Sequence, residues 1–384
     1  MGRSRVTLAD VARRAGLSKT AASMVLNGRE GTRLSAEAHQ RVFAAAEELG
    51  YRPNIAARSL RTRKTATIAF VSDIVATTRF AGELIRGAVD AARERDHVLL
   101  ITETQGDATF ERYAIEAMLD RQVDGVIYAA MATRRLSVPP AILNGPVVLL
   151  NATSTDDLPR VLPDDEQAGR TAAGTLLAHG HHDRIAIIGR HQLKEEDPEV
   201  SLAATARLTG IRDALGAAGV RPLTEVASAE WQPEHGYAAM RTLLRRSVRP
   251  SAVICMNDRL AFGVYQALGE AGLTVPHDIS VISFDDDPIA AWLRPGLSTV
   301  ALPHEQMGRR AVELLLDGAD NRPVMVPMRL RRRMSVARLA PGPEAPRPRP
   351  GAEPAGPPAT ADDPTAVVTP DPPGPAGRTA DPVA

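Results

Sequence analysis

From Thr65 onward, short apolar runs alternate with amphipathic helical stretches, and this alternation constrains the fold more than any other feature of the sequence. Strands that alternate with helices form parallel sheets that are covered on both faces. About 275 residues of this pattern are more than one sheet comfortably holds, so we expect two similar α/β subdomains, the second beginning near residue 163, with a cleft between them. The predicted strands are Ile68–Ser72, Val98–Thr102, Gly125–Ala129, Val147–Asn151, Ile185–Gly189, Ala252–Met256 and Ile279–Phe284.

The composition excludes several classes of protein. Of the 384 residues, 44% are hydrophobic and 24% are charged, which is typical of a soluble globular protein and not of a coiled-coil rod or a disordered chain. The single Cys255 cannot form an internal disulfide, and the N-terminal residues lack the apolar stretch of a secretory signal. No run approaches the ~18 consecutive apolar residues of a membrane span. We therefore expect a cytoplasmic protein.

The net charge of zero hides an asymmetry along the chain. Residues 1–64 carry 13 Lys and Arg against 5 Asp and Glu, whereas the remainder carries 33 basic and 41 acidic residues. A basic N-terminal segment on an acidic body predicts that this segment meets a polyanion. The alternative is a solvated basic tail.

The basic segment has the pattern of three short helices. Thr7 and Asp10 have the spacing of a capping box, and Gly16 ends the first helix. Ser18 is the expected N-cap of a second helix that runs from Lys19 to Leu26. A third helix opens at Ser35, carries Val42, Phe43, Ala46 and Leu49 on one apolar face, and closes at Gly50.

The first two helices have the outline of a helix-turn-helix, in which the second helix enters the major groove of DNA. A plain three-helix interaction module has the same outline, so the pattern alone leaves both readings open. The exposed face early in the second helix carries Lys19, Thr20, Ser23 and Met24. The full set of candidate DNA contacts in this segment is Thr7, Ser18, Lys19, Thr20, Ser23, Met24 and Asn27.

The segment from Val6 to Gly28 resembles the DNA-binding domain of the lactose-repressor (LacI/GalR) family of bacterial transcription regulators. The resemblance continues through Leu34-Ser-Ala-Glu, Ala46-Glu-Glu-Leu-Gly-Tyr-Arg-Pro-Asn and Ala56-Ala-Arg-Ser-Leu, and then to about residue 335. It implies a helix-turn-helix headpiece, a hinge helix, and two Rossmann-like α/β subdomains of the periplasmic-binding-protein type. It also implies a homodimer, or a tetramer, on pseudopalindromic operator DNA. Because Met24 stands where the family often has Arg, we expect apolar contact with a thymine methyl there instead of a bidentate guanine contact.

Residues 53–64 form the expected hinge. An isolated helix of about eight residues is marginal in water, so Pro53–Leu60 needs a partner to fold. The resemblance implies that paired hinge helices lie in the minor groove, where Leu60 would wedge between base pairs. Asn54 would cap this helix, Ala57 would allow close approach, and Arg58 would reach phosphate. A flexible linker whose Leu60 packs on the core is the alternative.

The expected effector site lies at strand ends that face the cleft. The resemblance places Asn257 and Asp285 at ligand-binding positions and Arg207 at the start of a helix, while Trp231 falls where some sugar-responsive members have an aromatic residue. A guanidinium suits vicinal hydroxyls or a carboxylate, and an indole stacks on a sugar ring. Asp73 and Asn151, at the ends of the first and fourth strands, are weaker candidates. Capping or core hydrogen bonding is the alternative for each residue, and Asp258 and Asp286 are assigned to such structural roles.

Other motifs give no support for catalysis, a cofactor or a metal. His179-Gly-His-His-Asp has the look of a metal-ligand run but falls at a helix-to-strand turn. Asp164 and Asp165 suit N-capping of a helix. The sequence shows neither a Gly-Lys-Ser/Thr phosphate loop nor a nucleophile elbow, so a hydrolase or kinase is disfavoured. A solute-binding protein would lack residues 1–64 and carry a signal peptide.

The predicted domains are a headpiece at 1–52, a hinge and linker at 53–64, an effector-binding and dimerisation core at 65–340, and a disordered tail at 341–384. The tail holds 14 of the 30 prolines and too few apolar residues to offset its ordering entropy; a Pro-rich docking motif is the alternative. The expected function is that of a DNA-binding transcription regulator, and a repressor in particular, controlled allosterically by a small molecule. Trp231, Asp285 and Arg207 favour a carbohydrate, and a purine or another metabolite is the alternative.

Overall fold

A computed structural model describes residues 6–27, 34–51, 64–74, 80–318 and 321–339. The chain divides into two compact units. The first comprises Met1–Met131, Val138–Leu150 and Gly308–Asn321, and the second comprises Ala132–Ser137, Asn151–Met307 and Arg322–Ala384. The chain therefore passes between the units more than once, which a single boundary near residue 163 does not describe.

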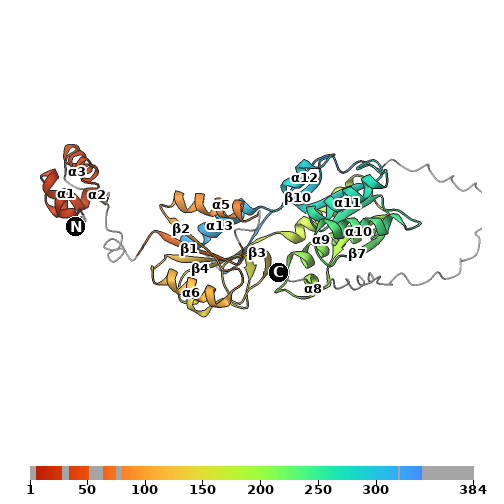
Figure 1. Cartoon of the computed structure of the whole chain (residues 1–384), viewed down its shortest axis with the longest axis horizontal. Coiled ribbons are helices and arrows are strands. Elements are labelled where there is room, and N and C mark those ends of the chain that lie inside the picture. The colour runs from red at the N-terminus through yellow and green to blue at the C-terminus, as the bar shows by residue number, and fades with distance from the viewer. Residues whose placement is uncertain (1–5, 28–33, 52–63, 75–79, 319–320, 340–384) are drawn as a thin grey trace, which may run out of the picture. The chain divides into compact units, whose positions relative to one another are not determined.

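The N-terminal part is a three-helix bundle of α1 (Leu8–Ala15), α2 (Lys19–Leu26) and α3 (Ala36–Glu48) (Figure 1). Local chemistry sets each boundary as predicted. Thr7 and Asp10 form the capping box of α1, and Gly16 ends α1 with a φ of 68°, a conformation that glycine adopts without strain. The side chains of Ser18 and Ser35 accept the hydrogen bonds that cap α2 and α3.

A small apolar core holds these three helices together. Val11, Ala22, Val25 and Val42 are buried in it. The predicted position of Phe43 on the inner face of α3 is wrong, because its side chain is 55% exposed. Ala45 takes the buried place instead, because Ala38, Val42 and Ala45 are spaced four and three residues apart and line one face of the helix, while Phe43 lies about 100° around the helix from Val42.

The first sheet has six strands in the order β11-β5-β4-β3-β1-β2. Strands β1 and β2 pair in parallel, as do β1 and β3. Figure 1 shows α5 and α13 on one face of this sheet and α6 on the other. The bounds are β1 Thr67–Ser72, α5 Ala81–Glu94, β2 Val98–Glu103, α6 Ala108–Leu119, β3 Gly125–Arg135, η1 Pro140–Asn144, β4 Val147–Thr153, β5 Arg160–Pro163, α13 His304–Asp317 and β11 Pro323–Val326.

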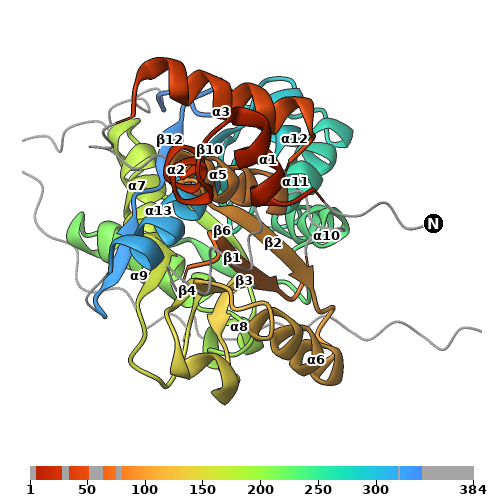
Figure 2. The same cartoon turned by 90° about the vertical axis from the view of Figure 1, so that its left-hand side faces the viewer.

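The second sheet also has six strands, in the order β12-β10-β9-β8-β6-β7. Strands β7, β6, β8, β9 and β10 are parallel, and only β12 runs antiparallel. The α7–α9 and α10–α11 pairs lie on opposite sides of β6 (Figure 2). The bounds are α7 Asp165–Ala178, β6 Ile185–Arg190, α8 Gln192–Glu196, α9 Ala203–Ala217, β7 Thr224–Ala227, α10 Pro233–Leu244, β8 Ala252–Cys255, α11 Asp258–Glu270, β9 Ser280–Asp285, α12 Pro288–Trp292, β10 Ser298–Ala301 and β12 Arg329–Arg331.

The strands of both sheets are apolar on both faces where helices cover them. Residues of β6, β8 and β9 are almost fully buried in one continuous core, as a doubly covered parallel sheet requires. All seven predicted strands exist, and five short ones, β5, β7, β10, β11 and β12, add to them. Within the described chain, no helix is long and apolar enough to cross a membrane.

Candidate functional site

The candidate site is centred on Arg207, which α9 carries into the second unit at the carboxyl ends of its strands. The guanidinium is 3% exposed. Its Nε donates to Asp165 Oδ1 over 2.7 Å, its Nη1 donates to the carbonyl of Met256 over 2.8 Å, and its Nη2 lies 2.9 Å from Asp285 Oδ1. The guanidinium also lies over the ring of Phe284, 4.8 Å from its centroid. Arg207 is thus fixed in position by groups from α7, from β9 and from the residue that follows β8.

Burial and charge oppose each other in this cluster. Burial alone would lower the pKa of Arg207, but Asp285 and Asp165 outweigh it, so the pKa of the guanidinium lies above its ordinary value. Burial raises the pKa of both carboxyl groups, and Arg207 opposes that rise. A buried cation bridged by two acids is costly to break, because removing one partner leaves a buried charge uncompensated.

The backbone at the end of β9 is strained. Asp285 has a φ of 104° and Asp286 a φ of 59°, in the left-handed region that residues other than glycine rarely occupy. Such strain is concentrated at ligand sites and active sites, where the surrounding structure holds it. Here the ion pair with Arg207 and the ion pair between Asp286 and Arg333 Nη2, at 2.7 Å, hold the two acids.

Asn257 and Trp231 come together at the same edge of the sheet. The Asn257 Oδ1 accepts from the backbone amide of Leu260 over 2.9 Å and caps α11, while its Nδ2 donates to the carbonyl of Trp231 over 3.1 Å. The Trp231 Nε1 donates to the carbonyl of Gly189 over 2.7 Å. Asn257 therefore caps a helix, which was the structural alternative to ligand binding. Its side-chain nitrogen has a second hydrogen that these two bonds do not use.

Asp258 and His304 are buried near this cluster. Asp258 accepts from the hydroxyl of Ser283 and from the backbone amide of Asp287. Burial and the nearby Asp285 raise the pKa of Asp258 to about 8. Burial and the charge of Arg207 lower the pKa of His304 to about 4. Asp258 thus has hydrogen bonds of the structural kind assigned to it, although it joins α11 to β9 and Asn257 takes the helix cap.

The weaker candidates have structural partners. Asp73 follows β1, and its carboxylate accepts from the backbone amides of Ile74 and Met131 at 2.9 and 3.1 Å. Asn151 was expected at the end of its strand, but β4 continues to Thr153. Asn151 is 4% exposed and accepts from the hydroxyl of Thr133 over 2.6 Å. Each of the two residues therefore has hydrogen bonds of the structural kind that the sequence left as the alternative.

The candidate DNA contacts are the N-cap of α1 and residues of α2 with its two caps. Thr7, Ser18, Lys19, Thr20 and Asn27 are exposed, while Ser23 and Met24 are half-buried. Some of these side chains already have local partners. Thr7 bonds to Asp10, and the Asn27 amide donates to the carbonyl of Ser23 over 2.6 Å. The hinge candidates Asn54, Ala57, Arg58 and Leu60 and the tail at 341–384 lie outside the described residues.

The His179-Gly-His-His-Asp run has a structural role at His181. Its ring nitrogens lie 3.1 Å from the hydroxyl of Ser251 and 3.1 Å from the carbonyl of Ala337. Among the residues that the structure describes, no group of three or more His, Cys, Asp and Glu side chains is arranged to hold a metal ion.

The sequence did not identify four members of the site or its surroundings. Asp165 was assigned to N-capping, but Asp164 caps α7 and Asp165 pairs with Arg207, 42 positions away. His304, Asp258 and Lys194 were not predicted as effector contacts, since the residues that surround each of them come from other parts of the chain. The one available signal is that Asp165 stands second in a pair of acids, where a single cap is sufficient.

Comparisons with known proteins agree with this architecture. Residues 7–54 match the family described as bacterial regulatory proteins, lacI family, and residues 173–336 match a periplasmic binding protein-like domain. The ribose operon repressor of Escherichia coli strain K12 is 33% identical over 314 residues, which cover 81% of this chain and 92% of that protein. A crystal structure of a lac repressor dimer bound to operator has a TM-score of 0.70 at 24% identity, covering 87% of this chain and all of that one.

A second solved structure is that of a LacI family transcriptional regulator from Enterococcus faecium with bound ribose. It is 27% identical, with a TM-score of 0.56, and covers 71% of this chain and all of its own.

Proposed function

This chain belongs to the lacI family of bacterial regulatory proteins, and on that premise we propose that it is a DNA-binding transcriptional repressor that a small molecule controls through the Arg207 cluster. The observation that carries the proposal is the pairing of a capped helix-turn-helix with a buried, strained, charged site at the carboxyl ends of β8 and β9. The proposal places the protein in the cytoplasm, as a regulator and not an enzyme, since its relatives are regulators.

The bundle supports DNA binding through the position of α2. Its N-terminal residues Ser18, Lys19 and Thr20 are exposed, and a helix N-terminus with a nearby cation suits a phosphate-lined groove. We propose Ser23, Met24 and Asn27 as further contacts along α2, and Thr7 at the start of α1. The hinge residues Asn54, Ala57, Arg58 and Leu60 complete the proposed interface.

The proposed effector is a carbohydrate. The two hydrogen bonds of Arg207, to Asp165 and to the carbonyl of Met256, use two of its five N–H groups. With the ion pair to Asp285 at Nη2, this leaves donors on the guanidinium for hydroxyl oxygens. Asp285, with a side chain 13% exposed, offers carboxylate oxygens to hydroxyl hydrogens, and Asn257 and Trp231 complete the proposed contacts on this unit. We propose Asp73 and Asn151 as further effector contacts. Relatives whose names refer to ribose support this class of ligand.

The proposed mechanism is thermodynamic linkage. Effector binding shifts the domain arrangement, the paired hinges respond, and operator affinity changes by a coupling of about 1–3 kcal/mol, or roughly 5–150-fold. Reciprocity requires operator DNA to change effector affinity by the same factor. We propose a homodimer as the acting species, with a tetramer as the alternative, because an inverted-repeat operator matches a two-fold axis.

The test measures ligand binding by calorimetry and duplex binding by fluorescence anisotropy on the full chain. We expect a sugar to bind and to change duplex affinity, and Arg207→Gln to abolish the response. Arg310→Gln is the matched control, because it removes an exposed cation that pairs with Glu313. A response to purines and not to sugars would contradict the carbohydrate assignment, and a full response in Arg207→Gln would contradict the site.

A further inference from the structure

The connection between β6 and α9 is long for its position in the sheet. It spans residues 191–202 and contains α8, whereas only Met256 and Asn257 separate β8 from α11. Both connections lie at the carboxyl ends of parallel strands, where α/β sheets bind ligands. Long connections at such an edge are commonly functional. The 191–202 segment therefore lies where side chains can select the ligand.

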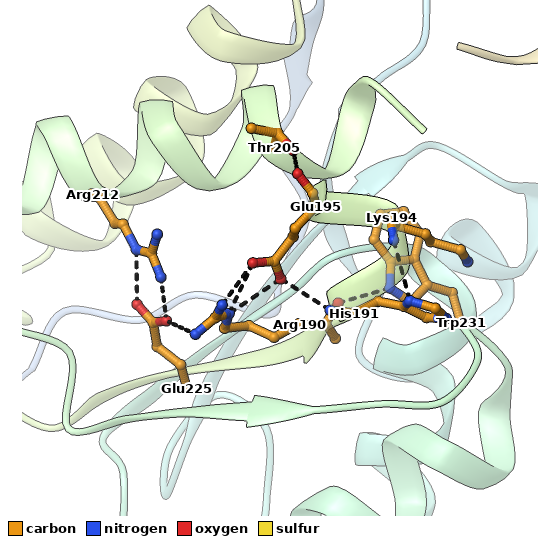
Figure 3. Close-up of polar contacts among 9 residues, drawn as sticks. Arg190, His191, Lys194, Glu195, Thr205, Arg212, Glu225 and Trp231 are labelled. Carbon is orange, nitrogen blue, oxygen red and sulfur yellow. Dashed lines mark hydrogen bonds and ion pairs between the residues drawn. The ribbon is translucent and has the colours of Figure 1, made fainter. Parts of the chain in front are cut away.

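A network of ion pairs holds α8 in place (Figure 3). Glu195 of α8 accepts from Arg190 at the end of β6, with its shortest bond at 2.6 Å, and from the backbone amide of His191 at 3.0 Å. Glu225 bonds to Arg190 at 3.1 Å and to Arg212 at 2.6 Å. Two guanidiniums thus face two carboxylates, so the charges of this network are matched. The network fixes the helix that carries Lys194.

Lys194 lies on the other side of α8, over Trp231 (Figure 3). Its Nζ is 4.6 Å from the centroid of the indole, within the range of a cation–π contact. Its side chain is 20% exposed, and its ion-pair partner Glu230 is 3.7 Å away and 62% exposed. Burial lowers the pKa of Lys194, while Glu230 opposes the shift. The Lys194 ammonium is therefore partly removed from water and has only a distant, exposed carboxylate as its partner. The guanidiniums of Arg190 and Arg212, in contrast, are hydrogen-bonded to carboxylates.

Trp231 joins Lys194 to the candidate site. Its ring receives the ammonium, its Nε1 is bonded to Gly189, and its carbonyl accepts from Asn257. The indole also packs against the core of the second unit. The sequence predicted that a sugar stacks on the indole of Trp231. On the face that Lys194 covers, a stacked sugar would first have to displace the ammonium. A ligand that used the ammonium would leave the Lys194–Trp231 pair in place.

We propose that Lys194 is a specificity-determining residue of the effector site and that the effector is a sugar carrying an acidic group, a carboxylate or a phosphate. The inference rests on the proposed function and names the class of its ligand. In this arrangement the sugar hydroxyls meet Asp285 and Asn257, and the acidic group meets the ammonium over Trp231. A charge-assisted hydrogen bond to a partly desolvated ammonium is stronger than a neutral one.

The binding test compares neutral and acidic sugars on the full chain by calorimetry. The probes are glucose against gluconate and glucose 6-phosphate, and ribose against ribose 5-phosphate. We expect an acidic sugar to bind the wild-type chain more tightly than its neutral counterpart. Lys194→Gln should weaken the acidic sugar about tenfold or more, as expected for a lost bond to a charged group, and change the neutral sugar less than about twofold. Lys194→Arg should recover part of the loss.

Arg241→Gln is the matched control, because Arg241 makes a cation–π contact with Tyr237 on α10, 5.7 Å from its centroid. It should leave both classes of sugar unchanged. Tighter binding of the neutral sugars, or equal losses for both classes in Lys194→Gln, would overturn the inference and leave the proposed function standing. If no sugar of either class bound, the carbohydrate assignment itself would fail with it.

Chemical modification gives a second readout that does not depend on a variant. Lys194 is the sole lysine after residue 64, and Lys19 is exposed on α2. Acetylation by an amine-reactive reagent can be followed at each lysine by mass spectrometry. We expect the bound acidic sugar to slow acetylation of Lys194 severalfold and leave Lys19 unaffected. An unchanged rate at Lys194 under saturating acidic sugar would overturn the inference.

Discussion

The close crossing of α7 and α9 leads to the sharpest prediction, for Gly169→Ala. A Cβ added at Gly169 would lie 2.1 Å from the carbonyl oxygen of Arg207 and 2.9 Å from the amide nitrogen of Ile211. The crossing is reciprocal, because a Cβ at Gly210 would lie 1.9 Å from the carbonyl oxygen of Glu166. Both obstacles are backbone atoms, which cannot rotate away as a side chain can.

The magnitude follows from this geometry. Ordinary Cβ contacts begin near 3.4 Å, so the helices must separate by about 1.3 Å at this point. Overpacking of a close-packed interior costs about 1–3 kcal/mol, and the better helix propensity of alanine returns up to ~1 kcal/mol. Because backbone atoms cannot yield, we expect the upper end of the cost and a net loss of about 2 kcal/mol. Gly174→Ala, on the same helix with nothing within 4 Å, should stabilise by about 0.5–1 kcal/mol.

Thermal denaturation of the two variants tests the prediction. For a unit of this size about 1 kcal/mol corresponds to roughly 2–4 °C, so Gly169→Ala should melt about 4–8 °C below the wild-type chain and Gly174→Ala slightly above it. The crossing also positions the Arg207–Asp165 pair, one partner on each helix, so effector affinity should fall in Gly169→Ala alone. Equal melting temperatures for the two variants would refute the argument from close packing.

Three further predictions concern a buried histidine, a buried acid and a helix cap. The pKa of His304 is lowered to about 4. The neutral ring therefore contributes about 3 kcal/mol to the free energy of unfolding above pH 6.5, and this contribution is lost as the pH falls towards 4. His304→Gln should flatten the decline in melting temperature over that range. The pKa of Asp258 is raised to about 8, so the contribution of its protonated carboxyl group to the free energy of unfolding is lost as the pH rises from about 4 through 8. Asp258→Asn should remove that loss, and an unaltered pH profile would count against the assigned burial. Thr7→Ala should cost about 1 kcal/mol in the bundle, seen as faster amide exchange in α1, whereas Thr7→Ser should not; equal exchange in both would contradict the capping box.

Much of the local structure was predictable, because its causes lie within a few residues. The caps Thr7, Ser18 and Ser35 and the stop at Gly16 act over one helical turn. Six of the seven predicted strands are apolar runs that are mostly buried, and the seventh, β2, is an apolar run that lies exposed or half-buried. The five missed strands are three or four residues long, and β7 and β11 are half-exposed, so they lack the continuous apolar pattern that signals a buried strand.

The site was only partly predictable, because its members meet through tertiary packing. Resemblance to the family brought Arg207, Asn257, Asp285 and Trp231 forward, and the structure places them around one sheet edge of the second unit. No local pattern could show that Asp165 would pair with Arg207, since the pair depends on the crossing at Gly169 and Gly210. The prediction for Phe43 was wrong for a local reason. Helical periodicity placed this residue inward with Val42, but Ala38, Val42 and Ala45 form the buried face of α3 and Phe43 lies outside that face.

The most direct test of the account is selection of duplexes from a random pool by the full-length protein, followed by measurement of affinity with and without a sugar. The account predicts enrichment of an inverted repeat, steep weakening of binding with salt as the basic segment releases counterions, and a change in affinity when the effector is present. If the protein showed no preference for any duplex over random sequence, with or without small molecules, the central claim would be contradicted.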